Sequence, residues 1–299
     1  KNILIIGFGS IGKRHANILK KFKNISNIYI LTKQICKNFK KIENIKQIKK
    51  IDPDYIIIAT KTSDHFKYLL FLEKNFSNKN ILVEKPLFEK YKKLKIKNNK
   101  IFVGYNLRYH PVLVFIKNFI KNKKIFSIDV NCHSYLPHWR KNRNYSKTNS
   151  AKKVYGGGAL LELSHEIDYL EWIFNKINKI KYVSIGKFSN LNIDCEDHVL
   201  IAGQIFKAEF FMSLNFYSLK TKRDIIINGN GFCLEGNLID NKIIIFQNGK
   251  KLFKKFKIDK NLTYKIQHRN LINGKFKNSC SFNQGLELMK TLDTIRANG

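Results

Sequence analysis

The chain lacks several features that would assign it to whole classes of protein. None of its 299 residues lies in an unbroken apolar run of the roughly eighteen residues that a membrane-spanning helix needs, so no membrane span is expected. No signal-type region precedes the first apolar run, residues 3–6, and we expect a cytoplasmic protein. The five cysteines lie far apart without a CxxC pair, which predicts reduced, buried thiols rather than a disulfide framework or a metal site.

Acidic residues and arginines are also scarce. Lys and Arg number 56 against 22 Asp and Glu, a formal net charge of +34, but only seven of the 56 are arginines. A dedicated nucleic-acid surface would concentrate arginines on one face for bidentate contacts, whereas these lysines occur in every region. We therefore expect a solvated basic surface and no dedicated nucleic-acid partner. Steep salt dependence of binding to DNA or RNA would indicate the alternative.

Apolar runs alternate with helical segments over the first third of the chain. The runs predicted as strands are residues 3–6, 28–31, 54–59, 80–83 and 100–103. Residues with helical spacing lie between most of them, and this alternation predicts a parallel sheet covered on both faces. The sequence thus predicts an α/β domain over residues 1–106.

The pattern changes after residue 106. Several strand-like segments follow one another, and turn signals such as Asn248-Gly249 join them. Residues 107–299 are therefore predicted as an α+β domain with a mostly antiparallel open sheet. Its closing helix, residues 285–296, either stays with that domain or packs back on the first.

A glycine-rich turn follows the first predicted strand and opens a helix. It reads Gly7, Phe8, Gly9, Ser10, Ile11 and Gly12. In this context Gly7 permits a tight turn, Gly9 lets the backbone approach a pyrophosphate, and Gly12 lets the helix pack on the strand. The turn predicts dinucleotide binding at the helix N-terminus, in a Rossmann domain.

The end of the second predicted strand indicates which dinucleotide binds. An acidic residue there would bind the ribose 2′-hydroxyl of NAD. This chain has Thr32 and Lys33, a hydroxyl and a cation, which favours the 2′-phosphate of NADP over NAD.

Five ordered motifs resemble the Gfo/Idh/MocA oxidoreductases, the relatives of glucose-fructose oxidoreductase and inositol dehydrogenase. They are GFGSIGKRH from residue 7, the segment after the third strand with Thr60, Thr62 and His65, VEKPL at 83–87, GYNLRYHP at 104–111, and GGGALLELSHEID at 156–168. The resemblance implies a Rossmann domain followed by an α+β domain that carries the substrate and often forms the oligomer, here a homodimer or homotetramer. It places Thr60, Thr62, His65, Glu84, Lys85 and Pro86 at the cofactor.

The resemblance also implies the catalytic residues. Lys85 follows an apolar strand and would polarise the reacting oxygen while hydride moves between substrate and nicotinamide. His165 would carry the hydroxyl proton. An acid usually stands four residues before this histidine, where this chain has Leu161. Glu162 is preferred as the equivalent acid, with Asp168 as the alternative, because both spacings would place a carboxylate on the helical face of His165. Asp168 is otherwise expected to bind a substrate hydroxyl.

Substrate-binding residues are expected in two further segments. Asn106 and Arg108 belong to the fourth motif. Trp139, Arg140 and Tyr145 lie in a polar, aromatic segment, where aromatic rings can stack on sugars and an arginine can bind a carboxylate or phosphate.

The sequence therefore predicts an NAD(P)-dependent oxidoreductase that acts on a CH–OH group of a sugar or sugar derivative. The candidate substrates include the anionic and nucleotide-linked sugars of surface-polysaccharide pathways. No metal site is expected. Two alternatives stay open: a redox-neutral sugar epimerase or eliminase that retains its cofactor, and a non-catalytic dinucleotide-binding regulatory protein.

Overall fold

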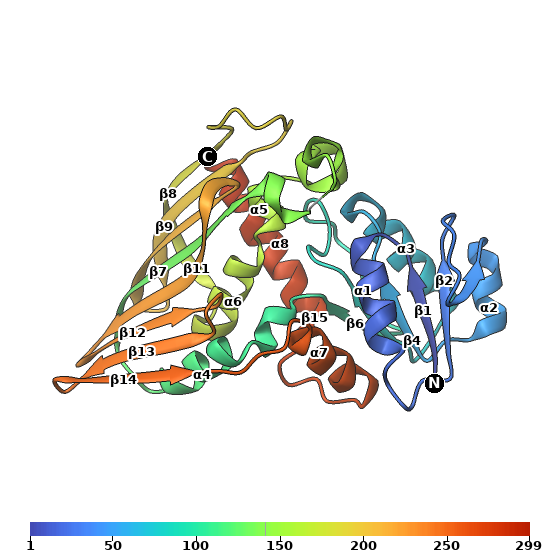
Figure 1. Cartoon of the computed structure of the whole chain (residues 1–299), viewed down its shortest axis with the longest axis horizontal. Helices are drawn as coiled ribbons and strands as arrows, with labels where there is room; N and C mark the ends of the chain where they lie inside the picture. Colours follow the sequence, from blue (N-terminus) through green and yellow to red (C-terminus); the bar gives the residue numbers. More distant parts are fainter. Residues whose placement is uncertain (141) are drawn as a thin grey trace. The chain divides into compact units, whose positions relative to one another are not determined.

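The computed structural model of the chain describes residues 1–140 and 142–299 and divides into two compact units (Figure 1). Unit 1 comprises residues 1–106 and 261–289, and unit 2 comprises residues 107–260 and 290–299. Each unit contains one sheet, and together they give the predicted fold class, a Rossmann domain with a second, mostly antiparallel sheet.

Unit 1 is built on a seven-stranded sheet with the order β15-β6-β5-β4-β1-β2-β3. Its strands are β1 (Asn2–Ile6), β2 (Asn27–Leu31), β3 (Lys40–Ile42), β4 (Tyr55–Ile58), β5 (Asn80–Val83), β6 (Lys100–Val103) and β15 (Cys280–Ser281). All pair in parallel except β15, which pairs antiparallel with β6. The order reverses direction at β1, which lies between β2 and β4, and ligands bind such sheets at this kind of switch point.

The helices of unit 1 bury the apolar strands. They are α1 (Ser10–Leu19), α2 (Ile48–Ile51), α3 (Thr62–Asn75) and α7 (Leu262–Ile272), with the short 3-10 helix η1 (Ile45–Gln47). Ile3, Ile5, Ile30 and Ile57 are fully buried in one core cluster, as a parallel sheet covered by helices requires. The edge strands β3 and β15 went unpredicted, because they span only three and two residues.

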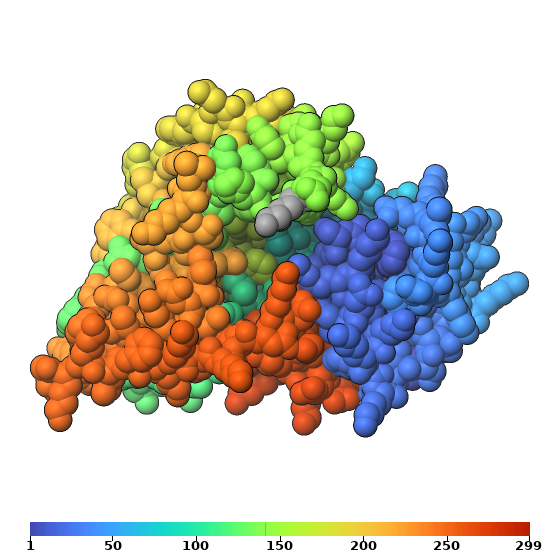
Figure 2. All heavy atoms as spheres, viewed as in Figure 1, coloured from blue at the N-terminus to red at the C-terminus, as the bar shows by residue number. Residues whose placement is uncertain are grey.

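Unit 2 is built on an eight-stranded sheet with the order β14-β13-β12-β11-β7-β10-β9-β8. The strands are β7 (Ile125–Tyr135), β8 (Ile177–Gly186), β9 (His198–Ile205), β10 (Ala208–Asn215), β11 (Tyr217–Gly229), β12 (Phe232–Asn237), β13 (Lys242–Gln247) and β14 (Lys250–Lys255). Among the described residues of this unit, β7 and β10 pair in parallel and every other strand pair is antiparallel. The edge strand β14 is exposed along its whole length, and Figure 2 shows this region in orange at the lower left.

Helices α4 (Pro111–Phe119), α5 (Ala159–Glu162) and α6 (His165–Phe174) contact strands of this sheet. Five 3-10 helices belong to unit 2 or its start: η2 (Asn106–Tyr109), η3 (Leu136–Trp139), η4 (Tyr145–Lys147), η5 (Asn149–Ala151) and η6 (Lys153–Tyr155). The last helix, α8 (Phe282–Ala297), is divided between the units at residue 289. Among the described residues, no helix has the length and apolar character that a membrane span requires.

Candidate active site

Each glycine of the turn after β1 occupies its position for a different physical reason. Gly7 has φ +98°, and a Cβ there would lie 2.6 Å from the carbonyl oxygen of Ala59. A Cβ on Gly12 would lie 2.2 Å from the carbonyl oxygen of Gly7, so α1 packs directly on the turn. A Cβ on Gly9 would meet open space, so this glycine is not required by packing within the chain. That combination fits a backbone that a pyrophosphate approaches closely.

The other residues of the turn differ in how far their side chains are buried. Phe8 is buried and meets Phe39 edge-on in the core, so only its main chain faces the turn. Ser10 is exposed at the first position of α1, and Ile11 packs partly against the core. The first turn of α1 contains no acidic residue, and Gly9 caps it without a side chain. Its main-chain amides therefore suit an anion.

The end of β2 lies beside this turn, because the Gly7 amide donates to the Leu31 carbonyl oxygen at 3.0 Å. Thr32 is half-buried, and its hydroxyl accepts a hydrogen bond from the Gln34 amide at 3.0 Å. Lys33 is exposed. The side chain that would meet a ribose 2′-substituent is thus the exposed, positively charged Lys33.

His65 links the segment after β4 to the segment after β5. It is buried in the first turn of α3, and its Nδ1 lies 3.1 Å from the Pro86 carbonyl oxygen and 3.3 Å from that of Leu87. Burial lowers the pKa of His65, so the ring is neutral and Nδ1–H donates to these carbonyls. Thr60 and Thr62, just before it, are half-buried. His65 therefore fixes the turn that contains Lys85.

Lys85 lies immediately beyond the carboxyl end of β5 and is half-buried. The Lys85–Pro86 peptide bond is cis. The preceding Glu84 is almost fully buried; its Oε1 lies 2.9 Å from Nε2 of His15, and its Oε2 accepts the Lys85 amide at 3.2 Å. No role was predicted for His15, although it ends the first motif.

In unit 2, the glycine-rich segment before His165 is held by the carboxylate of Glu196, a role that was not predicted from the sequence. Gly158 has φ +110°, and a Cβ there would lie 2.2 Å from Oε1 of Glu196. Glu196 accepts the Ala159 amide at its carbonyl and the Leu160 amide at Oε1, with distances of 2.9 and 3.2 Å. It therefore caps α5. Burial raises the pKa of Glu196.

His165 is the first residue of α6 and is half-buried. Glu162 lies on α5 instead, because the helix is interrupted at Leu163, where φ is −99° and ψ is 19°. The spacing argument for Glu162 assumed one continuous helix, and that assumption is wrong. The Glu162 carboxylate accepts a hydrogen bond from the Ser150 hydroxyl at 2.9 Å.

Asp168 forms a buried ion pair with Arg108. Nε and Nη2 of Arg108 donate to both oxygens of Asp168 at 2.7 to 3.2 Å. The side chains are 5% and 0% exposed. A second pair on the same helix joins Glu166 to Arg223 at 2.6 and 3.0 Å. The pairs fix α6, and thereby the backbone of His165, to η2 and to β11.

Asn106 and Arg108, predicted together, belong to different units of the chain. Asn106 lies in unit 1, where its amide donates to the Thr263 hydroxyl at 2.7 Å.

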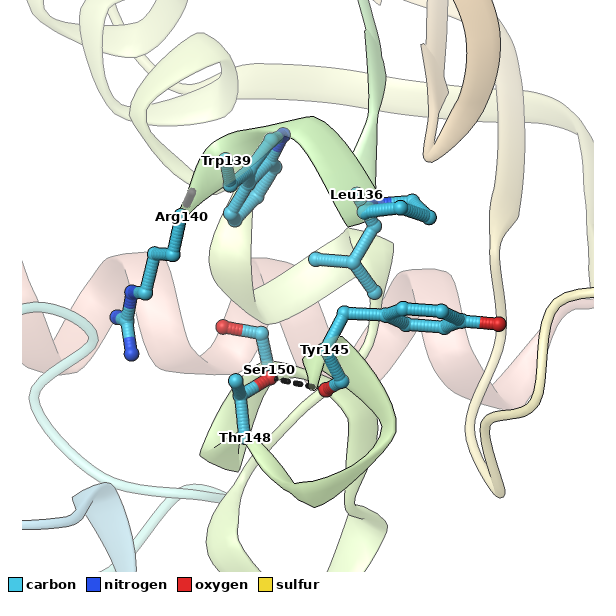
Figure 3. Close-up of a pocket in the computed structure, with 7 residues that line it drawn as sticks. Leu136, Trp139, Arg140, Tyr145, Thr148 and Ser150 are labelled. Carbon is cyan, nitrogen blue, oxygen red and sulfur yellow. Dashed lines mark hydrogen bonds between the residues drawn. The ribbon is translucent and has the colours of Figure 1, made fainter. Parts of the chain in front are cut away.

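Trp139, Arg140 and Tyr145 meet at one small pocket of unit 2, which Leu136, Pro137, Thr148 and Ser150 also line (Figure 3). Figure 3 shows the Arg140 side chain extending past Ser150, with Tyr145 on the other side. The Trp139 indole donates to the Ser134 hydroxyl at 3.0 Å, and the Tyr145 hydroxyl accepts the Asn192 amide at 3.0 Å. Because Ser150 also binds Glu162, the pocket adjoins the segment that leads to His165.

Residues 1–97 match the model of the Gfo/Idh/MocA family, described as an oxidoreductase family with an NAD-binding Rossmann fold. The resemblance is confirmed. The predicted enzyme class, an oxidoreductase, is confirmed with it, and the glycine turn described above lies in the matched segment.

Comparisons beyond this segment find sugar and nucleotide-sugar dehydrogenases. The glucose-6-phosphate 3-dehydrogenase of Bacillus subtilis (strain 168) is 23% identical over 258 residues, which are 79% of this chain and 71% of that protein. Levoglucosan dehydrogenase in complex with NADH superposes with a TM-score of 0.83 at 17% identity, covering 99% of this chain and 96% of the other. The WlbA dehydrogenase from Bordetella pertussis, in complex with NADH and UDP-GlcNAcA, gives 0.77 at 15% identity, with 99% and 95% covered. At these identities the two solved structures show a shared fold.

Proposed function

We propose that the protein transfers hydride between a nicotinamide dinucleotide and a carbon that bears the hydroxyl or carbonyl group of an anionic sugar. The observation that carries this proposal is the arrangement of unit 1, where the glycine turn, the Thr60–Thr62 segment and Lys85 follow β1, β4 and β5 at one edge of the sheet. A bound nicotinamide supplies the hydride acceptor or donor at this edge.

Lys85 acts as the polarising residue. Its main chain is fixed from two sides, by His65 at the Pro86 carbonyl and by the Glu84 carboxylate at its own amide. The ammonium group carried by this fixed backbone stabilises negative charge that develops on the reacting oxygen. His165 carries the proton, because an imidazole can both accept and donate one. The ion pairs of α6 and the cap on α5 fix its backbone. Glu162 or Asp168 supports it.

The small pocket of unit 2 supports an anionic substrate. The cavity has a volume of only about 10 Å³, room for one water, so a sugar would lie across its mouth and not inside it. There Arg140 supplies a planar cation, and Trp139 and Tyr145 supply rings that can stack on the sugar. A sugar phosphate stands in the name of the Bacillus subtilis relative, and the WlbA structure holds the nucleotide sugar UDP-GlcNAcA. Lys33 at the end of β2 supports NADP over NAD as the cofactor.

The sheet of unit 2 supports self-association into a homodimer or homotetramer. Alternate residues of β7, β9 and β10 are buried, which is the face on which α5 and α6 pack. The opposite face includes the half-exposed Phe211 and the partly buried Leu200 and Ile226. Light scattering on the purified chain measures the subunit number, and a monomer at all concentrations would contradict this part of the proposal.

Turnover by defined variants tests the function. The wild-type chain is titrated with NADPH and NADH by nicotinamide fluorescence and then assayed with sugar phosphates, UDP-sugars and neutral polyols. Lys85→Ala and His165→Gln should each lower kcat by about 100-fold or more. Lys90→Ala, an exposed lysine of the same segment, is the matched control and should keep wild-type turnover. A folded chain that binds neither cofactor, or one that prefers neutral polyols, would contradict the proposal.

A further inference from the structure

A chain of four buried polar side chains runs through unit 1, from the turn of Lys85 to α7. Nε2 of His15 lies 2.9 Å from Oε1 of Glu84, and its Nδ1 lies 2.8 Å from Nε2 of His268. Nδ1 of His268 lies 3.1 Å from the Tyr55 hydroxyl. Both histidines are 0% exposed and Tyr55 is 1% exposed. Buried polar groups persist where they are hydrogen-bonded, and here each ring nitrogen has a partner.

The chemistry of the two imidazoles sets the direction of these hydrogen bonds. Burial, and then the neighbouring His15, lower the pKa of His268 well below its usual value, so His268 is neutral. A neutral imidazole has one donor and one acceptor nitrogen. When His268 donates from Nε2 to His15, His15 donates from Nε2 to the Glu84 carboxylate, and the Tyr55 hydroxyl donates to His268. Every donor then meets an acceptor, and the only charge of the four lies on Glu84. The reverse direction requires one more proton in the His15–Glu84 pair.

The Glu84 carboxylate is confined on its other sides as well. Its second oxygen accepts the Lys85 amide at 3.2 Å. A Cβ on Gly104 would lie 3.0 Å from Oε1 of Glu84, so the carboxylate rests on the main chain of Gly104. Glu84 therefore transmits the position of His15 directly to the backbone of Lys85.

We propose that His15 and His268, supported by Tyr55, are positioning residues that hold the Glu84 carboxylate in place and thereby position Lys85 for hydride transfer. The inference rests on the proposed function, because it assigns these residues a role through Lys85. It also gives α7 a role in the reaction. That helix follows unit 2 in the sequence, yet supplies the imidazole that completes the network of unit 1.

Paired substitutions of His268 test the role in turnover. His268→Gln retains an amide N–H that reaches toward Nδ1 of His15, whereas His268→Leu removes it. We expect His268→Leu to lower kcat about 10- to 100-fold through misplacement of Lys85, with the dissociation constant for the cofactor changed less than about threefold. His268→Gln should recover most of the loss. Arg269→Ala, an exposed neighbour on α7, is the control and should match the wild type.

A measurement without substrate separates this inference from the proposed function. The rate at which an amine-specific reagent labels Lys85 is followed across pH by peptide mass spectrometry on the full chain. His268→Leu should change the Lys85 labelling rate at least about threefold, while the rate at Lys90 stays constant. If no sugar is turned over but the Lys85 rate shifts, the proposed function fails and the network stands.

Glu84→Gln gives a second route if His268→Leu does not fold. An amide cannot accept both from His15 and from the Lys85 main chain with the strength of a carboxylate, so Glu84→Gln should reproduce the shifted Lys85 labelling. Unchanged labelling in folded Glu84→Gln or His268→Leu protein would overturn the inference. Equal kcat losses in His268→Gln and His268→Leu would overturn it too.

Discussion

The two units hold their candidate site residues by different means. In unit 1 the residues follow parallel strands, and the sheet order alone places Gly7, Thr60 and Lys85 at one edge. In unit 2 the residues around His165 lie on short helices joined to the sheet by ion pairs, Arg108 to Asp168 and Arg223 to Glu166. The first arrangement depends on backbone pairing and the second on buried charge.

This difference predicts that the two units respond differently to single substitutions. A parallel sheet buried on both faces tolerates changes at exposed strand ends, because its hydrogen bonds and apolar core lie elsewhere. A buried charge is tolerated only while its partner is present. Single substitutions at the ion pairs of unit 2 should therefore lower the free energy of unfolding most. At the glycine turn of unit 1 they should affect either packing or cofactor binding, depending on the glycine that is changed.

Breaking the Arg108–Asp168 pair should give the largest effect. Arg108→Leu leaves Asp168 buried without its cation, and we expect a loss of about 3–5 kcal/mol in the free energy of unfolding. Urea unfolding of the full chain measures the loss, and hydrogen exchange in α6 against β1 assigns it to unit 2. The double variant Arg108→Leu/Asp168→Leu should recover most of it, because it removes both charges. Equal losses in the single and double variants would show that the pair is not the cause.

Acid should weaken unit 2 through His110. Burial, and then the charge of Arg223, lower the pKa of His110 to about 4 from 6.5. Its Nδ1 accepts the Val112 amide at the start of α4, which a protonated ring cannot do at that nitrogen. Between pH 6.5 and pH 4 the unfolded chain therefore binds a proton that the folded chain does not. Stability present above pH 6.5 falls by about 3 kcal/mol as the pH is lowered through this window.

The control for this effect is His110→Asn, which keeps a side chain that caps helices but does not titrate. Urea unfolding at pH 7 and pH 4.5 should show a smaller difference for the variant than for the wild type. His65 and His268 have lowered pKa values in unit 1 and contribute with the same sign, so a residual difference is expected. An identical pH dependence in variant and wild type would contradict the assignment to His110.

A pair of glycine substitutions separates packing from binding in unit 1. Gly12→Ala places a Cβ against the Gly7 carbonyl and should cost about 1–3 kcal/mol in the free energy of unfolding. Gly9→Ala points into open space and should leave the melting temperature unchanged while NADPH and NADH bind more weakly. If Gly9→Ala bound both dinucleotides as tightly as the wild type, the close approach of the backbone to a pyrophosphate would be refuted.

The smallest effect should come from the exposed end of β2. Lys33→Ala should weaken NADPH binding about fivefold, or ~1 kcal/mol, because the lost charge is solvent-exposed. NADH binding should not change, and Lys23→Ala, another exposed lysine of unit 1, should affect neither. Equal weakening of NADPH and NADH by Lys33→Ala would remove the support for NADP.

Much of unit 1 could be predicted because its signals are local. The apolar runs of β1, β4 and β5 predict a parallel sheet, and such sheets place the residues after their strands at one edge. The edge strand β3 was missed because Lys40 and Lys41 give it no apolar run. In unit 2 the helix around His165 was predicted, but its interruption at Leu163 was not. Nothing in the local sequence marks that break. Glu196, which caps the start of α5, was also not predicted to do so, because it lies 36 positions after Leu160.

The sequence by itself determined the fold class and the glycine turn, because each follows from periodicity or from residues close together in the chain. Its five ordered motifs carry the family resemblance, which implies the roles predicted for Lys85 and His165. Only the tertiary structure decided what surrounds them. His15 meets His268 across 253 positions, and Arg108 meets Asp168 across 60. These partners are selected by burial, which makes an unpaired charge or imidazole costly, and burial is a property of the folded chain.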